Sequence, residues 1–312
     1  MNIIKGLNVV FSCISSTELS FVILHLKMST SLAIVSRQIV IYGGIPVCIV
    51  GIIGSVLNII IFLSLETFRK NSSAFYLIIM SMFNIGQLSL GFFFSRIIIA
   101  LIGTDGTTFS LFYCKLRIYL IQICVGSSLT CFCLATIDQF FATCSHPRWQ
   151  QLSNIKIAYR LVILTIFFWI CHGIPYLIYY KHIQSSTTNT ITCGSENILF
   201  NNYRTYVFVL ALIGYLPIII AVLFGYLSYH NIQQITYRTV PLIRRELDKQ
   251  LTSMVLIQVI FNIFTLLPYT TFNAIATNAS FTNDPNIQLQ LQLILNIIII
   301  IYNIYFAVSY TL

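Results

Sequence analysis

Long apolar runs alternate with short polar segments along this chain. A helix that crosses the bilayer core needs about 20 mostly apolar residues, and strands of membrane barrels instead alternate over about ten residues. The runs here are long and almost unbroken, as in residues 45–65 and 291–306. They predict an all-α membrane protein, a bundle of seven transmembrane helices over residues 39–65, 73–103, 111–144, 157–180, 203–231, 245–277 and 287–310.

Composition agrees with a membrane location. Of 312 residues, 57% are apolar and 8% are charged, against about 25% charged residues in ordinary soluble domains. So few charges cannot cover a soluble surface, so the remaining surface must face lipid. The net charge of +9 would suit nucleic acid in a soluble protein, but the Lys and Arg residues lie between apolar runs. Membrane topology explains them more simply, and we expect a multi-pass membrane protein with no nucleic-acid partner.

The chain divides into an N-terminal segment, residues 1–38, and a seven-helix domain, residues 39–312. Met28 lies just upstream of the first strong span, so residues 1–27 are either a genuine part of the protein or a dispensable extension. Lys and Arg near helix ends favour an extracellular N-terminus and a cytoplasmic C-terminus. The margin is small, nine against eight, or nine against six if the chain starts at Met28.

Two of the nine cysteines stand apart from those inside the apolar spans. Cys114 begins the third predicted helix and Cys193 lies in the loop between the fourth and fifth. Both belong to the same membrane face, where an oxidising exterior would let them pair. The alternative is two free thiols. A disulfide here would hold the long loop over the mouth of the bundle.

Several landmarks then appear in a fixed order along the helices. Asn58 stands alone in the first helix, and Asp138-Gln139-Phe140 follows Cys114 by 24 residues in the third. The later helices carry Trp169, Pro175, Pro217 and Pro268. Together these residues resemble the rhodopsin-like (family A) G-protein-coupled receptors over residues 39–312. The loop at residues 69–76 resembles divergent invertebrate receptors of the peptide-receptor-like type.

The resemblance implies a multi-pass receptor of the plasma membrane that binds an extracellular ligand and activates a heterotrimeric G protein as the sixth helix moves about Pro268. It implies no cofactor. The sequence also lacks the spacings of a metal site, a nucleophile elbow or a phosphate-binding loop, so we expect no enzyme activity. Two rival interpretations stay open: a membrane transporter or channel, and a seven-helix protein that does not couple to a G protein.

The chain departs from the family at its coupling motifs. Gln139 replaces the arginine that follows Asp138, and Asp248 occupies the place of its acidic partner on the sixth helix. A Gln139–Asp248 contact would be a hydrogen bond, weaker than a bidentate ion pair, so we expect a looser inactive lock. Near the end of the chain, residues 306–310 keep Tyr310 of the seventh-helix motif without its Asn and Pro, and a register based on Asn303 is an alternative.

The middle of the bundle is expected to hold an interhelical polar network. Amides inside a membrane need partners on neighbouring helices. The second helix offers Asn84 and Gln87 where the family usually places a sodium-binding aspartate, so sodium regulation is not expected. The network residues are Asn58, Asn84, Gln87 and Asn303.

The outer halves of the helices supply the candidate ligand pocket. No carboxylate occurs at residues 120–123, where amine receptors of the family place one, so a monoamine ligand is not expected. We expect a neuropeptide or another small ligand. Basic groups would suit an acidic group or a peptide carboxyl terminus, unless they only extend to lipid headgroups. The candidates are Arg96, Gln122, Tyr176, Arg204, Tyr269 and Asn273. The family's Trp before Pro268 is absent, which leaves Phe261, Phe264 and Tyr269 as candidate switch residues, and His172 is interpreted as a packing residue.

Overall fold

The computed structural model describes residues 2–69, 71–144, 146–184, 191–235, 242–278 and 285–308. Side chains are described over a smaller part, which leaves out residues 1–31, 33, 67, 234–249, 277–289 and 308–312. Within the described residues, seven helical segments are long and apolar enough to cross a membrane: 34–64, 72–102, 111–143, 155–179, 198–233, 250–276 and 290–307. The seven predicted spans are confirmed, with boundaries that differ by a few residues.

The seven segments are built from the following helices, some of them joined end to end. The first span is α1 (Asn2–Ser64), the third is α5 (Leu111–Thr143) and the fourth is α7 (Ile155–Tyr179). The sixth is α10 (Leu242–Asn278) and the seventh is α11 (Pro285–Val308). The second joins α3 (Ser72–Gly86), η1 (Gln87–Ile97) and α4 (Ile98–Ile102), and the fifth joins α8 (Ile198–Asn202), η3 (Tyr203–Tyr215) and α9 (Leu216–Ile235). Both η1 and η3 are π-helical.

Short elements connect these helices. They are α2 (Glu66–Arg69), η2 (Gly106–Thr108), α6 (Pro147–Gln150) and the antiparallel strands β1 (Lys181–Gln184) and β2 (Ile191–Gly194). Helix α1 begins well before the first span, so the N-terminal segment is continuous with the first transmembrane helix rather than a separate element.

Polar residues fix where several spans begin. The side chains of Asn71, Ser110 and Asn154 each accept a hydrogen bond from a backbone N–H in the first turn of α3, α5 and α7. Such caps satisfy donors that have no partner inside the helix. The cap at Asn71 starts the second span slightly earlier than its apolar run suggested.

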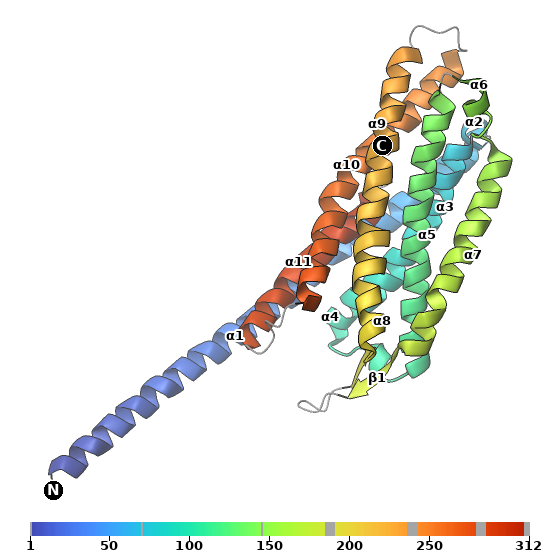
Figure 1. Cartoon of the computed structure of the whole chain (residues 1–312). Helices are drawn as coiled ribbons and strands as arrows, with labels where there is room; N and C mark the ends of the chain where they lie inside the picture. Colours follow the sequence, from blue (N-terminus) through green and yellow to red (C-terminus); the bar gives the residue numbers. More distant parts are fainter. Residues whose placement is uncertain are drawn as a thin grey trace.

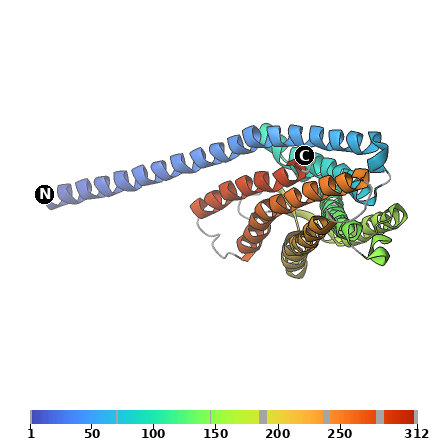
Figure 2. The same ribbon diagram turned by 90° about the horizontal axis from the view of Figure 1, so that it is seen from above.

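Helix α5 lies at the centre of the bundle, packed against α3, α7 and α9 (Figures 1 and 2). Its contact with α7 is close because Gly126 has no side chain: a Cβ there would overlap the ring of Trp169. Trp169 also donates from Nε1 to the Thr130 hydroxyl at 3.0 Å. The tryptophan therefore holds the third and fourth spans together, and Gly51 similarly lets α1 approach Leu88 and α11.

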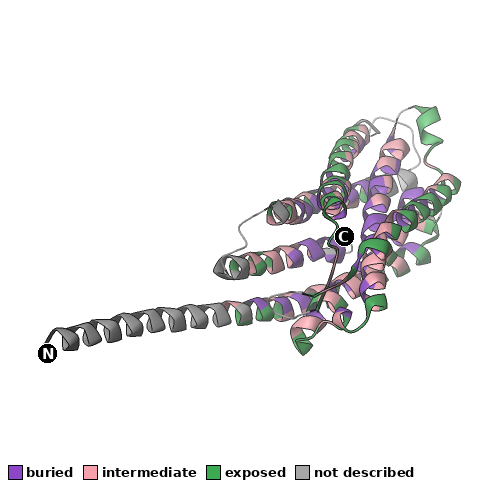
Figure 3. Cartoon of the chain, turned by 60° about the horizontal axis from the view of Figure 1, so that its bottom comes forward, coloured by how far each residue is buried: buried purple, intermediate pink, exposed green. Residues whose placement is uncertain are grey.

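The outer surface is apolar, while polar groups gather inside. Figure 3 shows exposed positions along the outward sides of the helices and buried ones along the inner sides. Ile163 and Phe167 on α7 are 67% and 63% exposed. In contrast, Asn84, Ser127 and Ser128 are fully buried between helices. This arrangement is that of a bundle surrounded by lipid.

Candidate functional site

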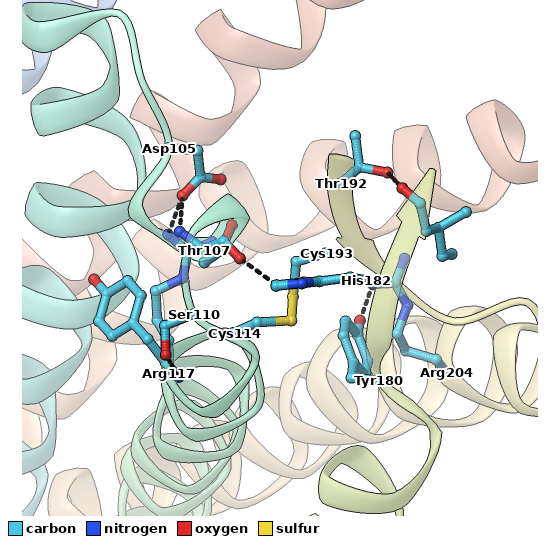
Figure 4. The surroundings of a disulfide bond; sticks show 12 residues. Asp105, Thr107, Ser110, Cys114, Arg117, Tyr180, His182, Thr192, Cys193 and Arg204 are labelled. Atoms are coloured by element: carbon cyan, nitrogen blue, oxygen red, sulfur yellow. Dashed lines mark hydrogen bonds and ion pairs between the residues drawn. A yellow bond between two sulfur atoms is a disulfide. The ribbon is translucent and has the colours of Figure 1, made fainter. Parts of the chain in front are cut away.

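A disulfide joins Cys114 at the start of α5 to Cys193 on β2, as predicted. We call this end of the bundle the disulfide end and the opposite end, where α5 carries Asp138, the Asp138 end. Strands β1 and β2 form a hairpin in which His182 pairs with Cys193, and His182 Nε2 lies 2.7 Å from the carbonyl oxygen of Thr107. Figure 4 shows the hairpin, the disulfide and η2 held together at the mouth of the bundle.

A cavity of about 900 Å³ lies between the helices at the disulfide end. Drug-sized ligands occupy pockets of roughly 300–1,000 Å³, so this space suits a small ligand or the end of a peptide. The structure brings together at its walls all six residues proposed for the ligand pocket: Arg96, Gln122, Tyr176, Arg204, Tyr269 and Asn273. Its other walls include apolar side chains such as Ile99, Ile118, Phe208 and Ile299.

Sequence reasoning missed a polar contribution from α7. His172 was interpreted as packing alone, but its Nδ1 lies 3.3 Å from Gln122 Nε2 and its Nε2 lies 2.7 Å from the Tyr203 hydroxyl. The histidine thus links α5, α7 and η3 behind the cavity wall at Gln122. The available signal was a single imidazole in an apolar helix, since such a group needs polar partners inside a bundle.

Helices α10 and α11 contribute one part of the cavity wall. Tyr269, which directly follows Pro268 in α10, stacks on Tyr302 of α11 with ring centroids 4.1 Å apart. Both tyrosines line the cavity. Of the three candidate switch residues, only Tyr269 faces it. Phe264 is 70% exposed and Phe261 37% exposed on the lipid side, so the expectation for these two was wrong; their helical phase turns them outward.

The proposed polar network is divided into pairs. Asn58 Nδ2 donates to the Ser81 hydroxyl at 2.8 Å, linking α1 to α3, and the Ser128 hydroxyl of α5 donates to Asn84 Oδ1. Gln87 and Asn303 instead line the cavity. Asn303 donates to the Ile299 carbonyl at 2.7 Å. Its Oδ1 and the Oε1 of Gln87 are buried without a partner in the described part of the chain; such groups are normally satisfied by water or a ligand.

At the Asp138 end, the Asp138 carboxylate is held by serines rather than by an arginine. Its Oδ2 accepts hydrogen bonds from Ser72 at 2.7 Å, from Ser153 at 3.2 Å and from Ser73. Ser72 and Ser73 begin α3, and Ser153 follows α6. The carboxylate therefore joins three segments of the chain through charge-assisted hydrogen bonds, which are about twice as strong as neutral ones.

Gln139 makes a contact between the third and sixth spans. Its Oε1 accepts a hydrogen bond from the Thr252 hydroxyl of α10 at 3.3 Å, and Gln139 is 1% exposed. Ser228 of α9 lies 3.5 Å from Thr252 and 3.4 Å from Thr143, oxygen to oxygen. This chain of hydroxyls joins α5, α9 and α10 at the Asp138 end.

The remaining predicted coupling residues have different outcomes. Phe140 packs against Phe224 of α9, with ring centroids 5.5 Å apart. Pro268 lies inside α10, as expected for a kinked sixth helix. The Asp248 side chain and Tyr310 lie outside the described residues.

Comparison with known families matches residues 54–308 to the model described as "7 transmembrane receptor (rhodopsin family)". The match covers most of the chain and every span except the first part of α1. The chain belongs to the rhodopsin family of seven-transmembrane receptors. No curated protein matches it significantly.

As a rhodopsin-family receptor, the chain is a multi-pass membrane protein of a family of signalling receptors. Its seven-helix bundle and its disulfide follow the family plan. The receptor differs from that plan in the polar contacts of its Asp138 end. Gln139 cannot form an ion pair, and the charge of Asp138 is stabilised by Ser72, Ser73 and Ser153 instead.

Proposed function

We propose that this rhodopsin-family receptor binds an extracellular ligand in the cavity at the disulfide end and activates a heterotrimeric G protein at the Asp138 end. The receptor lies in the plasma membrane with its N-terminus outside, so that the disulfide faces the oxidising exterior. Its ligand is a neuropeptide or another small molecule. The size of the cavity and the mixture of arginines and apolar residues in its walls support this ligand class.

The stack of Tyr269 on Tyr302 carries the proposal. Both rings face the ligand cavity, and Tyr269 is the first residue after the proline of α10. Proline removes a backbone hydrogen bond and weakens the helix at that point. A ligand that moves the Tyr269 ring therefore acts directly on the position about which α10 bends.

At the Asp138 end, α10 packs against α5. Thr252 of α10 donates to Gln139 of α5, while Leu251 and Val255 are buried in an apolar cluster with Cys131 and Ala135. In the proposed mechanism, ligand binding favours an arrangement in which α10 leaves these contacts. The G protein then binds between α5 and α10, since it prefers the open arrangement.

The test measures nucleotide exchange in cells that display the full chain and a promiscuous G protein, challenged with a library of short peptides. Wild type is compared with Gln139→Arg at equal surface expression. A ligand-dependent response from wild type supports the proposal and makes arginine dispensable at this position. A response from Gln139→Arg alone identifies a bundle that binds ligand without coupling. Transport of ions or solutes, with no exchange in either variant, would replace the proposal by the transporter alternative.

A further inference from the structure

The cavity carries more positive than negative charge. Among its described lining residues are four arginines, Arg37, Arg96, Arg117 and Arg204, and one acid, Asp105. Four positive charges against one negative leave an excess of three. Charged groups inside a membrane bundle are costly unless they are paired or solvated. The four arginines differ in how far the protein itself provides those partners.

Two of the arginines are already engaged by the protein. Arg117 Nη1 lies 3.3 Å from Asp105 Oδ1, and its guanidinium stands over the Tyr113 ring at 5.7 Å. Arg37 donates from Nε to the Ala100 carbonyl at 2.5 Å and from Nη2 to the Leu101 carbonyl at 3.0 Å. These carbonyls lie at the C-terminal end of α4, where a positive charge is favourable. Both arginines therefore have structural roles at the mouth.

The other two retain binding capacity. Arg204 donates from Nη1 to the Tyr180 hydroxyl at 2.8 Å, and its Nε, like that of Arg117, is buried without an acceptor among the described residues. Unlike Arg117, Arg204 has no acidic partner in that part of the chain. Arg96 likewise forms no ion pair with any of the described residues. Arg96, Arg204 and Tyr269 line the same cavity. Arg96 comes from η1 and Arg204 from η3, so two arginines from different helices, neither paired with an acid among the described residues, share this cavity.

We propose that Arg96 and Arg204 together bind a carboxylate of the ligand, while the apolar walls take the rest of it. The proposal rests on the proposed function, because it names the chemical class of ligand for that cavity. A guanidinium group presents N–H donors in a planar fork that matches a carboxylate. The bound carboxylate lies beside Tyr269, so its arrival is transmitted to the residue that follows Pro268.

Carboxylates occur both in small organic acids and at the free end of a peptide. The experiment therefore uses the full chain in nanodiscs of phosphatidylcholine, with unfolding followed by tryptophan fluorescence. The probes are acetate, N-acetyl-Leu-Leu-Phe with a free carboxyl terminus, the same peptide as an amide, and inorganic phosphate. Chloride keeps the ionic strength constant. Ligand that binds only the folded state raises the melting temperature in a saturable way, by about 2–4 °C at ten times its Kd.

We expect saturable stabilisation by a free carboxylate and none by the amide. Stabilisation by the peptide acid at lower concentration than acetate assigns the site to a peptide terminus; equal concentrations assign it to the carboxylate alone. Arg96→Gln and Arg204→Gln should each raise the apparent Kd about tenfold or more. Arg37→Gln and Arg117→Gln are the matched controls, whose apparent Kd should change less than threefold.

The proposal would be overturned if the peptide acid and the peptide amide stabilised the receptor equally. An unchanged apparent Kd in Arg96→Gln and Arg204→Gln would also overturn it, as would tighter binding of phosphate than of acetate and the peptide acid. Arg204→Lys provides a second variant that keeps the charge and the fold while removing the fork; its Kd should lie between wild type and Arg204→Gln. No G protein is present in this measurement. Carboxylate binding without nucleotide exchange contradicts the proposed function alone, and exchange without carboxylate binding contradicts this inference alone.

Discussion

Tyr269 of α10 and Tyr302 of α11 stack with their ring planes 20° apart. Below them, the Tyr302 ring meets Phe306 edge-on at 5.2 Å, and Phe132 of α5 meets Tyr305 at 6.4 Å. An aromatic path thus runs from the cavity into the buried centre of the bundle. The path includes no tryptophan, and its first member, Tyr269, directly follows Pro268 of α10.

Replacing Tyr269 by Ala should uncouple the cavity from α10. Stacked aromatic pairs contribute about 0.5–1.5 kcal/mol beyond their buried area, so agonist potency for G-protein activation should fall about 3–10-fold. Tyr269→Phe keeps the stacked ring and should stay close to wild type. Phe264→Ala removes an aromatic ring of the same helix on its lipid side and is the matched control; a similar loss there would mean that the effect is not specific to the stack.

The hydrogen bond between Thr252 and Gln139 should restrain the receptor in the absence of ligand. A neutral hydrogen bond contributes about 1 kcal/mol, so Thr252→Ala should raise basal nucleotide exchange about fivefold at equal surface expression. Ser253→Ala changes the neighbouring hydroxyl, which is exposed, and should leave basal exchange unchanged. Basal exchange that falls in Thr252→Ala would show that this contact belongs to the active arrangement.

The serines around Asp138 should stabilise the fold. Removing one hydrogen bond to a charged group costs about 1.5–3 kcal/mol, so Ser73→Ala should lower the melting temperature of the purified receptor by several degrees. Ser64→Ala is the control, because Ser64 is exposed and its hydroxyl only bonds the Ile60 carbonyl of its own helix. Equal melting temperatures for Ser73→Ala and wild type would show that the hydrogen bond from Ser73 to Asp138 does not stabilise the fold.

The disulfide should matter for both stability and the shape of the cavity mouth. Such bonds contribute typically about 2–4 kcal/mol, so Cys193→Ser should lower the melting temperature and reduce binding of any ligand held under the β1–β2 hairpin. Cys171→Ser removes a free, exposed cysteine and should behave as wild type in thermal unfolding and in ligand binding.

The sequence predicts the spans and the disulfide because each depends on a local property: a long apolar run, or a cysteine at a helix end. It also indicates the cavity-lining residues Arg96, Gln122, Arg204 and Asn273, since charged and amide side chains within a membrane helix usually face the inside of the bundle. The partners of these residues could not be predicted. The contact of Asp138 with Ser153 spans a loop, and that of Gln139 with Thr252 depends on how α5 and α10 are packed.

Orientation around a helix axis explains the wrong expectations. Phe261 and Phe264 lie in the same helix as Tyr269, and all three are aromatic residues close to Pro268. Buried polar residues mark the inner side of this helix at Gln258, Asn262 and Thr265. Phe261 and Phe264 each directly precede one of these residues, so the helical period turns their rings away from that side. His172 was misjudged for a different reason. An imidazole in an apolar helix gives no sign of its partners, and here Gln122 and Tyr203 come from two other helices.

The most direct test of the account measures the distance between α10 and the loop after α6 at the Asp138 end. Nitroxide labels at Gln151→Cys and Gln250→Cys, both exposed positions, are introduced after replacing the reactive native cysteines, and their separation is recorded by pulsed electron resonance. We predict that a nucleotide-free heterotrimeric G protein shifts the distances to longer values, and that Tyr269→Ala reduces the shift produced by ligand. A distance distribution that stays the same in the presence of bound G protein would contradict the proposed movement of α10 about Pro268.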